Sequence, residues 1–324
     1  MKSVNGSGRR VHLCGGMTVA IALLLGAPAR AQPPEVNVLG SQVEEKASEA
    51  LALFGLIAVP NDAASTISLD GTGGTTDLLS VQTGGGFRVS EDFPLYLEGF
   101  AGYQRYDPIF VFSNGTDSAN IRARWNAVAL TGGVGWDFDI TENFTIRPMA
   151  HLTFGRIVSD LELGALFVGN KLDRDVGFLV NGGLTAAGYG ASLSGLYEKK
   201  TEAYEFELSG RFTHLQIETV GSSSDVDASS DASVASFWTR YREPIRDWRA
   251  FGQPVRWVVD GSLGLYDGGP TVFPGIEWLA GIGAGLELDV SDTRLIWTTR
   301  ARLMARYYFG QDYRGWGVGL GISF

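Results

Sequence analysis

The sequence predicts an all-β protein: a closed antiparallel transmembrane β-barrel of about 12 strands with a short N-terminal helix. Three observations predict this fold class. They are a secretory leader at residues 1–31, long runs that alternate apolar with small or polar residues, and the last segment, GWGVGLGISF (residues 315–324). Successive side chains of a strand point to opposite faces. A strand with bulk on one face and almost none on the other fits a barrel surrounded by lipid.

The leader is typical of a secretory signal peptide. Three basic residues precede the apolar run 17–27, and the small residues of 29–31 form a cleavage site before Gln32. The apolar run is too short for a membrane-spanning helix. The single cysteine, Cys14, would leave with the leader, so we expect no disulfide and no cysteine-bound metal in the mature chain.

Composition and charge narrow the function classes. Glycine accounts for 44 of the 324 residues, which is roughly twice the ordinary ~7% usage. Without the leader, 36 acidic residues face 22 basic ones, a balance of −14, which argues against a nucleic-acid partner. No segment after the leader has 18 uninterrupted apolar residues, so a membrane crossing has to use strands. We therefore expect a protein of the Gram-negative outer membrane.

Residues 32–62 are predicted to form a helical segment before the barrel. Ser41 can cap the helix, Glu44 and Glu45 lie in its first turn, and Pro60 ends it. Its polar half precedes an apolar half. Two arrangements fit this pattern: a short helix that leans on the barrel, or a plug inside the lumen.

Residues 63–324 are predicted to form the barrel. Short turns alternate with longer loops, at 107–119, 159–175 and 221–233, as in outer-membrane barrels. An even number of strands places both ends of the barrel on one side of the membrane. The twelve strands are predicted at about 64–70, 76–89, 94–106, 119–139, 143–157, 175–198, 202–218, 232–242, 253–266, 274–290, 293–309 and 313–324.

The last strand carries an apolar outer face that ends on an aromatic residue: Trp316, Val318, Leu320, Ile322 and Phe324. This pattern resembles the C-terminal signal by which outer-membrane barrels are recognised for assembly. With the helix and the mid-barrel strand NFTIRPMAHLTFGR (residues 143–156), the chain resembles the translocator barrel of autotransporters over residues 40–324. The resemblance implies two partners, outer-membrane lipids and the barrel assembly machinery, and we expect a monomer. Because only residues 32–39 separate leader and helix, we expect an autotransporter-like barrel without a passenger.

Charged residues on the inward face of two neighbouring strands form the candidate site. The members are Glu277, Glu287, Asp289, Arg294, Arg300, Arg302 and Arg306. A tight turn at 291–292 predicts that Asp289 lies near Arg294 and that Glu277 lies near Arg306. Opposite charges directly across a strand pair contribute roughly 0.2–1 kcal/mol each. Two interpretations stay open: a salt-bridge ladder that braces the wall, or a charged constriction that selects anions or small solutes.

Enzyme chemistry has little support in the sequence. His151 faces inward and is followed by Thr153, so a lipid-facing His-x-Ser pair is absent and we predict a wall histidine. No Gly-x-Ser-x-Gly motif, phosphate loop or metal-ligand spacing stands out. We expect no enzyme activity and no cofactor. The predicted function is a narrow, porin-like pore or a structural membrane barrel. The alternatives are an adhesin-like barrel with partner-binding loops and a lipid-active outer-membrane enzyme.

Overall fold

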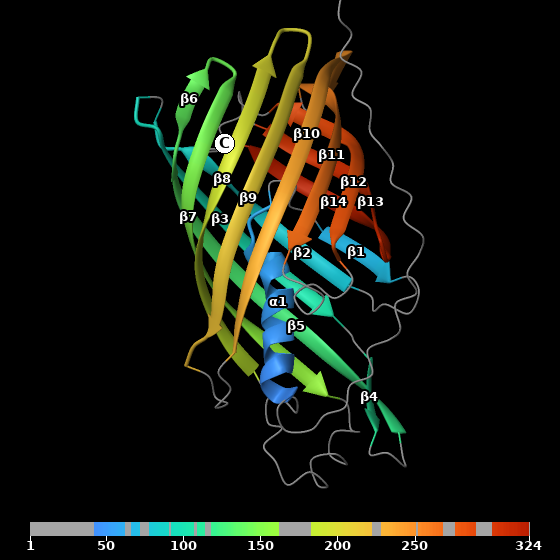
Figure 1. Ribbon diagram of the computed structural model, residues 1–324. Helices are drawn as coiled ribbons and strands as arrows, with labels where there is room; N and C mark the ends of the chain where they lie inside the picture. Colours follow the sequence, from blue (N-terminus) through green and yellow to red (C-terminus); the bar gives the residue numbers. More distant parts are fainter. Residues whose placement is uncertain are drawn as a thin grey trace, which may run out of the picture. The chain divides into compact units, whose positions relative to one another are not determined.

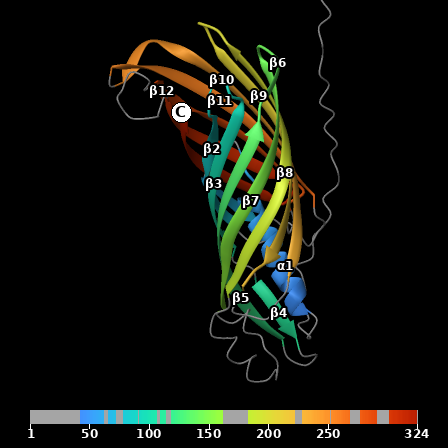
Figure 2. The ribbon, with the colours of Figure 1, turned by 90° about the vertical axis from the view of Figure 1, so that its left-hand side faces the viewer.

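The barrel is seen in the computed structural model of the chain (Figures 1 and 2). The structure describes residues 42–61, 66–71, 78–90, 92–106, 109–113, 118–161, 183–221, 228–250, 252–267, 276–289 and 300–323. The predicted leader, the helix cap Ser41, the turn at 291–292, Arg294 and Phe324 lie outside these residues. None of the described residues forms a helix with the length and hydropathy needed to span a bilayer.

One helix, α1 (Gln42–Ala58), precedes the strands. The strands are β1 (Thr66–Gly71), β2 (Leu78–Arg88), β3 (Leu95–Tyr106), β4 (Ile109–Ser113), β5 (Ser118–Trp136), β6 (Phe138–Thr141), β7 (Phe144–Leu161), β8 (Gly183–Lys200), β9 (Glu205–Thr219), β10 (Ser229–Ala250), β11 (Gln253–Asp267), β12 (Trp278–Asp289), β13 (Arg300–Gly310) and β14 (Tyr313–Ser323).

Twelve of these strands form a closed antiparallel ring. Each pairs with its neighbours in chain order, β5 pairs directly with β7, and β1 pairs with β14, for example Ser68 opposite Trp316. The two remaining strands are short additions: β4 pairs with the first residues of β5, and β6 with the first residues of β7. The predicted closed barrel of 12 strands with one short helix is confirmed.

Two connections differ from the sequence prediction. Part of the predicted loop 107–119 is strand, because β4 folds back on the start of β5. The connection expected between the predicted strands 232–242 and 253–266 is mostly strand as well, since β10 continues to Ala250. The register of β10 against β11 shifts between Pro244 and Arg249. A bulge of this kind admits a proline, which cannot donate to the ladder.

The alternation of side chains decides which face each residue takes. The last strand turns Trp316, Val318 and Leu320 outward, with 68, 56 and 77 % of their surface exposed. Its other face carries the glycines of GWGVGLG. The same holds along β7, where Leu152 and Phe154 are exposed and His151 is buried. The outer surface of the ring is therefore apolar, and the polar side chains line the lumen.

Candidate functional site: the barrel lumen

The lumen has two ends that differ in their connections. The short turns β8–β9 and β10–β11 lie at one end, called the turn end here, and the longer connection β9–β10 lies at the other, the loop end. Helix α1 (blue in Figure 1) occupies the half near the loop end. It packs with the loop-end residues Ile157, Leu184, Leu215, Ile217 and Val234 in one apolar cluster.

Helix α1 lies inside the ring. Its residues Leu51, Phe54 and Ile57 have at most 1 % of their surface exposed, and the helix contacts six strands: β2, β3, β5, β7, β9 and β10. A helix that is buried on all sides has to be surrounded by protein. Of the two arrangements that fit the sequence, the structure has the helix in the lumen.

Side chains of the wall hold the last turn of α1. The Gln82 Nε2 donates to the carbonyl oxygens of Ile57 and Val59, at 2.9 and 2.8 Å. The Thr131 hydroxyl donates to the carbonyl oxygen of Ala58 at 2.7 Å. The last carbonyls of a helix have no partner within the helix. Gln82 and Thr131 therefore cap α1 from the barrel wall.

One wall glycine allows α1 to approach closely. A Cβ atom at Gly102 would lie 2.7 Å from both the Cβ and the carbonyl oxygen of Ile57. A larger residue at this position would push the helix away from β3. The wall is thus shaped to the helix backbone as well as to its side chains.

The turn-end half of the lumen is filled by charged side chains instead. Glu205 accepts hydrogen bonds from Arg300 at 2.7 and 3.0 Å. Glu287 accepts from Arg302 at 2.8 Å and from Arg242 at 3.4 Å, and it is 1 % exposed. Charged hydrogen bonds of this kind are about twice as strong as neutral ones. These strands are held together by a network of arginines and carboxylates rather than by an apolar core.

The pair Asp260–Arg306 crosses a whole strand. Asp260 is on β11 and Arg306 is on β13, and they are joined at 2.6 and 3.0 Å over β12. Gly283 lies between them, and a Cβ atom there would come within 2.6 Å of both side chains. The absence of a side chain at Gly283 therefore makes room for a contact between second-neighbour strands.

A smaller cluster lies on the opposite arc of the ring. Glu98 accepts two hydrogen bonds from Arg211, at 3.1 and 2.6 Å. His151 Nδ1 is 3.4 Å from Glu98, across Gly133, and His151 Nε2 is 2.8 Å from the Ser192 hydroxyl oxygen. The predicted wall position of His151 is therefore observed, with all of these side chains buried.

The connectivity Ser192–His151–Glu98 is that of a serine–histidine–carboxylate triad. A base in such a triad must accept a proton on the nitrogen that faces the serine. Here the Arg211 Nη2 lies 3.3 Å from that same nitrogen. A guanidinium at this distance opposes positive charge on the ring, so the arrangement is suited to bracing the wall.

The described residues of the predicted charge ladder lie opposite other residues than the sequence predicted. Asp289 lies opposite Arg300 rather than Arg294, and Arg306 lies opposite Gly283 rather than Glu277. Glu277 precedes β12 and is exposed, so it is not in the network. The predicted pair Glu277–Arg306 is wrong, because Arg306 pairs with Asp260. The predicted pair Asp289–Arg294 involves Arg294, which lies outside the described residues. Arg300, Arg302 and Glu287 do meet inside the lumen.

Several members of the network were missed in the sequence: Glu98, Glu205, Glu207, Arg211, Arg240, Arg242, Arg256 and Asp260. Their alternation with apolar residues was visible and marks their inward direction. Several of their contacts were not visible, because Glu98–Arg211, Glu205–Arg256 and Asp260–Arg306 join strands that are not neighbours in the ring.

A separate ion-pair group lies at the rim of the turn end. Arg88 donates to Asp139 at 2.7 Å, and its Nε lies 3.1 Å from Asp137. Arg147 is also paired with Asp137. The hydrogen bond from Arg88 holds the pKa of the Asp139 carboxyl below its usual range. This group is partly exposed and joins β2 to the short strand β6.

The solved structures with a similar course of chain include three autotransporter barrels. The beta domain of the Bordetella autotransporter BrkA has a TM-score of 0.45 and 14 % sequence identity, and the match covers 81 % of this chain and 100 % of that one. The NalP translocator domain from Neisseria meningitidis has a TM-score of 0.45 and 12 % identity, covering 88 % of this chain and 100 % of that one. The third is the transport unit of the autotransporter AIDA-I from Escherichia coli, with a TM-score of 0.41 and 11 % identity, covering 87 % of this chain and 99 % of that one.

Among curated proteins, no sequence matches the chain. A family model does match about a third of the chain, from the second half of α1 almost to the end of β7. The matching model is the autotransporter beta-domain, over residues 54–160.

Proposed function

We propose that the chain is a bacterial outer-membrane β-barrel of the autotransporter translocator type, whose lumen is closed by α1 and the charged network. The observation that carries the proposal is a closed ring of strands with an apolar outer face. Lipid cannot satisfy free backbone groups, and a ring without edges leaves none. The match of residues 54–160 to the autotransporter beta-domain supports the specific type.

Aromatic side chains on the outer face support a membrane position. At the turn end Tyr241 lies between Tyr204 and Trp257, with ring centroids 5.6 and 5.3 Å apart. At the loop end Trp316 lies 4.9 Å from Tyr307. Outer-membrane barrels carry two such aromatic girdles, one at each interface of the membrane. The apolar residues of the outer face lie between the two groups.

Single cysteines test the membrane position. The variants Leu152→Cys and Leu303→Cys, on the outer face, should react with a lipid-soluble maleimide after the protein is inserted into vesicles. The matched control Ser262→Cys, on the lumenal face of β11, should not react with it. Equal labelling of all three, or recovery of the protein without detergent as a soluble monomer, would contradict the proposal.

The closed lumen is a separate part of the proposal. Helix α1 is buried in the loop-end half, and the network crosses the turn-end half. We therefore expect the intact protein to show little steady current in a planar bilayer. A large, stable conductance of the intact chain would contradict the closed lumen, but it would not contradict the outer-membrane position.

The last strand fits a role in assembly. Strand β14 closes the ring against β1 over six residue pairs, with bulky side chains outward and glycines inward. A charge at Leu320 would face lipid, where charged residues are costly near the midplane. We expect Leu320→Asp to lower the amount of protein in the outer membrane, whereas Leu320→Ile should leave it unchanged.

A further inference from the structure

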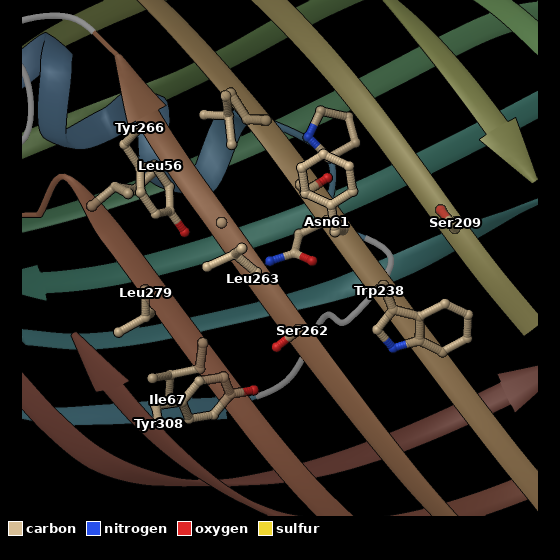
Figure 3. A pocket seen from close by; sticks show the side chains of 16 residues that line it. Leu56, Asn61, Ile67, Ser209, Trp238, Ser262, Leu263, Tyr266, Leu279 and Tyr308 are labelled. Atoms are coloured by element: carbon tan, nitrogen blue, oxygen red, sulfur yellow. The ribbon is translucent and has the colours of Figure 1, made fainter. Parts of the chain in front are cut away.

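The lumen and the outer face of the barrel differ in how their basic residues are partnered. Lumenal arginines lie in ion pairs with carboxylates of the chain, as Arg306 does with Asp260. The cavity beside the end of α1, with a volume of about 50 Å³, is lined by uncharged side chains such as Trp238, Ser262 and Tyr308 (Figure 3). A charged ligand would therefore meet no opposite charge in this cavity. One arc of the outer face, by contrast, presents arginines toward the membrane.

Three arginines at the loop end of neighbouring strands point outward. Arg105 is on β3, Arg124 on β5 and Arg156 on β7, and these strands are paired in this order. Successive side chains of a strand point to opposite faces. Next to each arginine in sequence is a side chain with at most 4 % of its surface exposed, namely Gln104, Trp125 and Ile157. Because these neighbours face the lumen, the three arginines belong to the outer face.

The register brings the three arginines close together. Arg105 lies opposite Asn126 on β5, and Arg156 lies opposite Val128. Arg124, Asn126 and Val128 are consecutive outward positions of β5, so the arginines occupy three successive rows of the outer face. Paired strands are about 4.8 Å apart, so the three arginines span about 10 Å across their strands. Arg105, Arg124 and Arg156 are called the arginine group here.

The arginine group lies at the level of one membrane surface. At the turn end, Trp136 of β5 packs against Phe93, with ring centroids 5.2 Å apart, and belongs to the aromatic girdle there. Asn126, opposite Arg105, lies ten residues before Trp136 in the same strand. A strand rises about 3.4 Å per residue and tilts by about 35–45° in such barrels, so these residues cover about 25 Å of height, which is the height of the apolar band. The exposed side chain of Leu130 lies within this band.

The side chain of Arg156 extends toward the loop end. A Cβ atom at Gly183 would lie 3.1 Å from the Arg156 Nη2. Gly183 lies opposite Val158, one outward row nearer the loop end than Arg156. Long basic side chains near a membrane surface keep their apolar stem along the hydrocarbon and place the charged head among the headgroups. The bare position at Gly183 makes room for the Arg156 guanidinium to do so.

The arginine group has more positive charge than the facing strand positions balance. The register places one acidic residue, Asp160, opposite Arg124. Three basic residues and one acidic residue leave a surplus of two positive charges at these described positions. A basic side chain is costly at the midplane of the membrane and nearly neutral at its surface. Anionic headgroups at the surface can supply the missing negative charge.

We propose that the arginine group binds the phosphates of a lipopolysaccharide headgroup in the outer leaflet. The inference rests on the outer-membrane position proposed above, since the longer loops of such barrels lie on the cell surface. A guanidinium binds phosphate through two parallel N–H bonds, and three guanidinium groups suit a headgroup with more than one phosphate. Tyr103 and Asn126, joined by a hydrogen bond of 2.9 Å, add polar groups in the same rows for the sugar hydroxyls.

The first test is native mass spectrometry of the full-length protein in detergent micelles. The probes are bisphosphorylated lipid A, which is the glycolipid part of lipopolysaccharide, lipid A with one phosphate removed, and phosphatidylglycerol. We expect bisphosphorylated lipid A to bind about tenfold or more tightly than phosphatidylglycerol, with monophosphorylated lipid A in between. Equal affinities for bisphosphorylated lipid A and phosphatidylglycerol would overturn the proposal. Displacement of the bound lipid by excess sodium phosphate would also overturn it, because the free ion would then account for the binding.

Variants locate the site. The double variant Arg124→Gln/Arg156→Gln should lower the affinity for bisphosphorylated lipid A about tenfold or more. The matched control is Arg314→Gln, the same change at another exposed, outward-facing arginine of the loop end, on β14. It should bind lipid A as the wild type does. Wild-type affinity in the double variant, or an equal loss in Arg314→Gln, would overturn the proposal.

Two single changes separate a phosphate site from a general effect of charge. Arg156→Lys keeps the positive charge but loses the planar fork of donors, so its affinity for bisphosphorylated lipid A should lie between those of the wild type and Arg156→Gln. Gly183→Val keeps all three arginines but crowds the Arg156 guanidinium, and it should weaken binding several-fold. Equal affinities in the wild type, Arg156→Lys and Arg156→Gln would contradict a site at Arg156.

The maleimide labelling of Leu152→Cys distinguishes this inference from the proposed function. Strong labelling together with no preference among the lipids would overturn the lipopolysaccharide site alone. Loss of labelling would overturn the outer-membrane position itself.

Discussion

The two halves of the lumen are filled by different means. The loop-end half is filled by α1, a separate segment whose side chains are held by apolar packing and by two wall caps. The turn-end half is filled by the wall's own side chains, which are joined by charged hydrogen bonds. Moving α1 would cost close apolar packing and a few hydrogen bonds, whereas separating the charged side chains would leave buried charges without partners. The two halves are therefore stabilised by different interactions and should respond differently to substitution and to salt.

The largest expected effect concerns the charged half. Glu287→Gln removes the carboxylate that pairs with Arg242 and Arg302 and leaves both cations buried. Breaking a buried ion pair on one side costs about 3–5 kcal/mol. The free energy of unfolding in urea, followed by tryptophan fluorescence, measures this loss.

The control for this prediction is Glu277→Gln. Glu277 is exposed, although the sequence analysis predicted it in the same network. Exposed substitutions usually stay within about 0.5 kcal/mol. If Glu287→Gln and Glu277→Gln lowered the free energy of unfolding equally, the buried network would contribute no more to stability than an exposed surface residue, and the prediction would be wrong.

A second effect tests the apolar half. Leu51→Ala truncates a side chain of α1 with no exposed surface. The expected loss in free energy of unfolding is about 3 kcal/mol, from lost burial and the remaining cavity. Leu56→Ala on the same helix, where the side chain is partly exposed, should cost clearly less. The losses in these two variants should not depend on salt concentration, and a strong salt dependence would count against apolar packing.

The sequence allowed the faces of the strands to be predicted, but not the partners across them. Asp289 lies opposite Arg300 and not Arg294, a displacement of six residues along β13. An even displacement keeps every side chain on its face, because the period of a strand is two. For this reason Arg306 was correctly placed in the lumen although its partner is Asp260 and not Glu277. The contact Asp260–Arg306 was beyond prediction, because it joins strands that are not neighbours.

The position of α1 also could not be decided from sequence. Its polar first half and apolar second half fit both a helix on the barrel and a helix in the lumen. The deciding groups are Gln82 and Thr131, which lie on two wall strands and bond the end of the helix. Neither residue carries a local signal for a helix cap, since each lies more than twenty residues away in sequence.

A third prediction concerns the release of α1. The double variant Gln82→Leu/Thr131→Val removes the caps and leaves the carbonyls of the last helical turn without partners. A buried polar group without a partner costs about 1–3 kcal/mol. We expect more frequent opening events in planar-bilayer recordings than for the intact protein. Thr83→Val, an outward-facing change on β2, should behave like the wild type, and identical recordings for all three proteins would contradict the capping role.

The smallest effect is expected at the rim of the turn end. The pKa of Asp139 is lowered by its hydrogen bond with Arg88. A carboxyl group with a lowered pKa stabilises the folded state above its unfolded pKa and loses that contribution as the pH falls through the folded value. Asp139→Asn should therefore melt slightly below the wild type at neutral pH, and the two melting temperatures should converge below about pH 4. High salt should also reduce the difference, because the group is exposed to solvent.

The missing side chain at Gly283 bears on the strand register of the closed barrel. Two paired strands can slip by two residues and still show the same faces, so the hydrogen-bond ladder alone does not reject such a mistake. The contact between Asp260 and Arg306 spans β11, β12 and β13. A slip on either side of β12 separates the two groups. One ion pair over a bare position therefore depends on two alignments at once, and a barrel with either strand pair out of register lacks it.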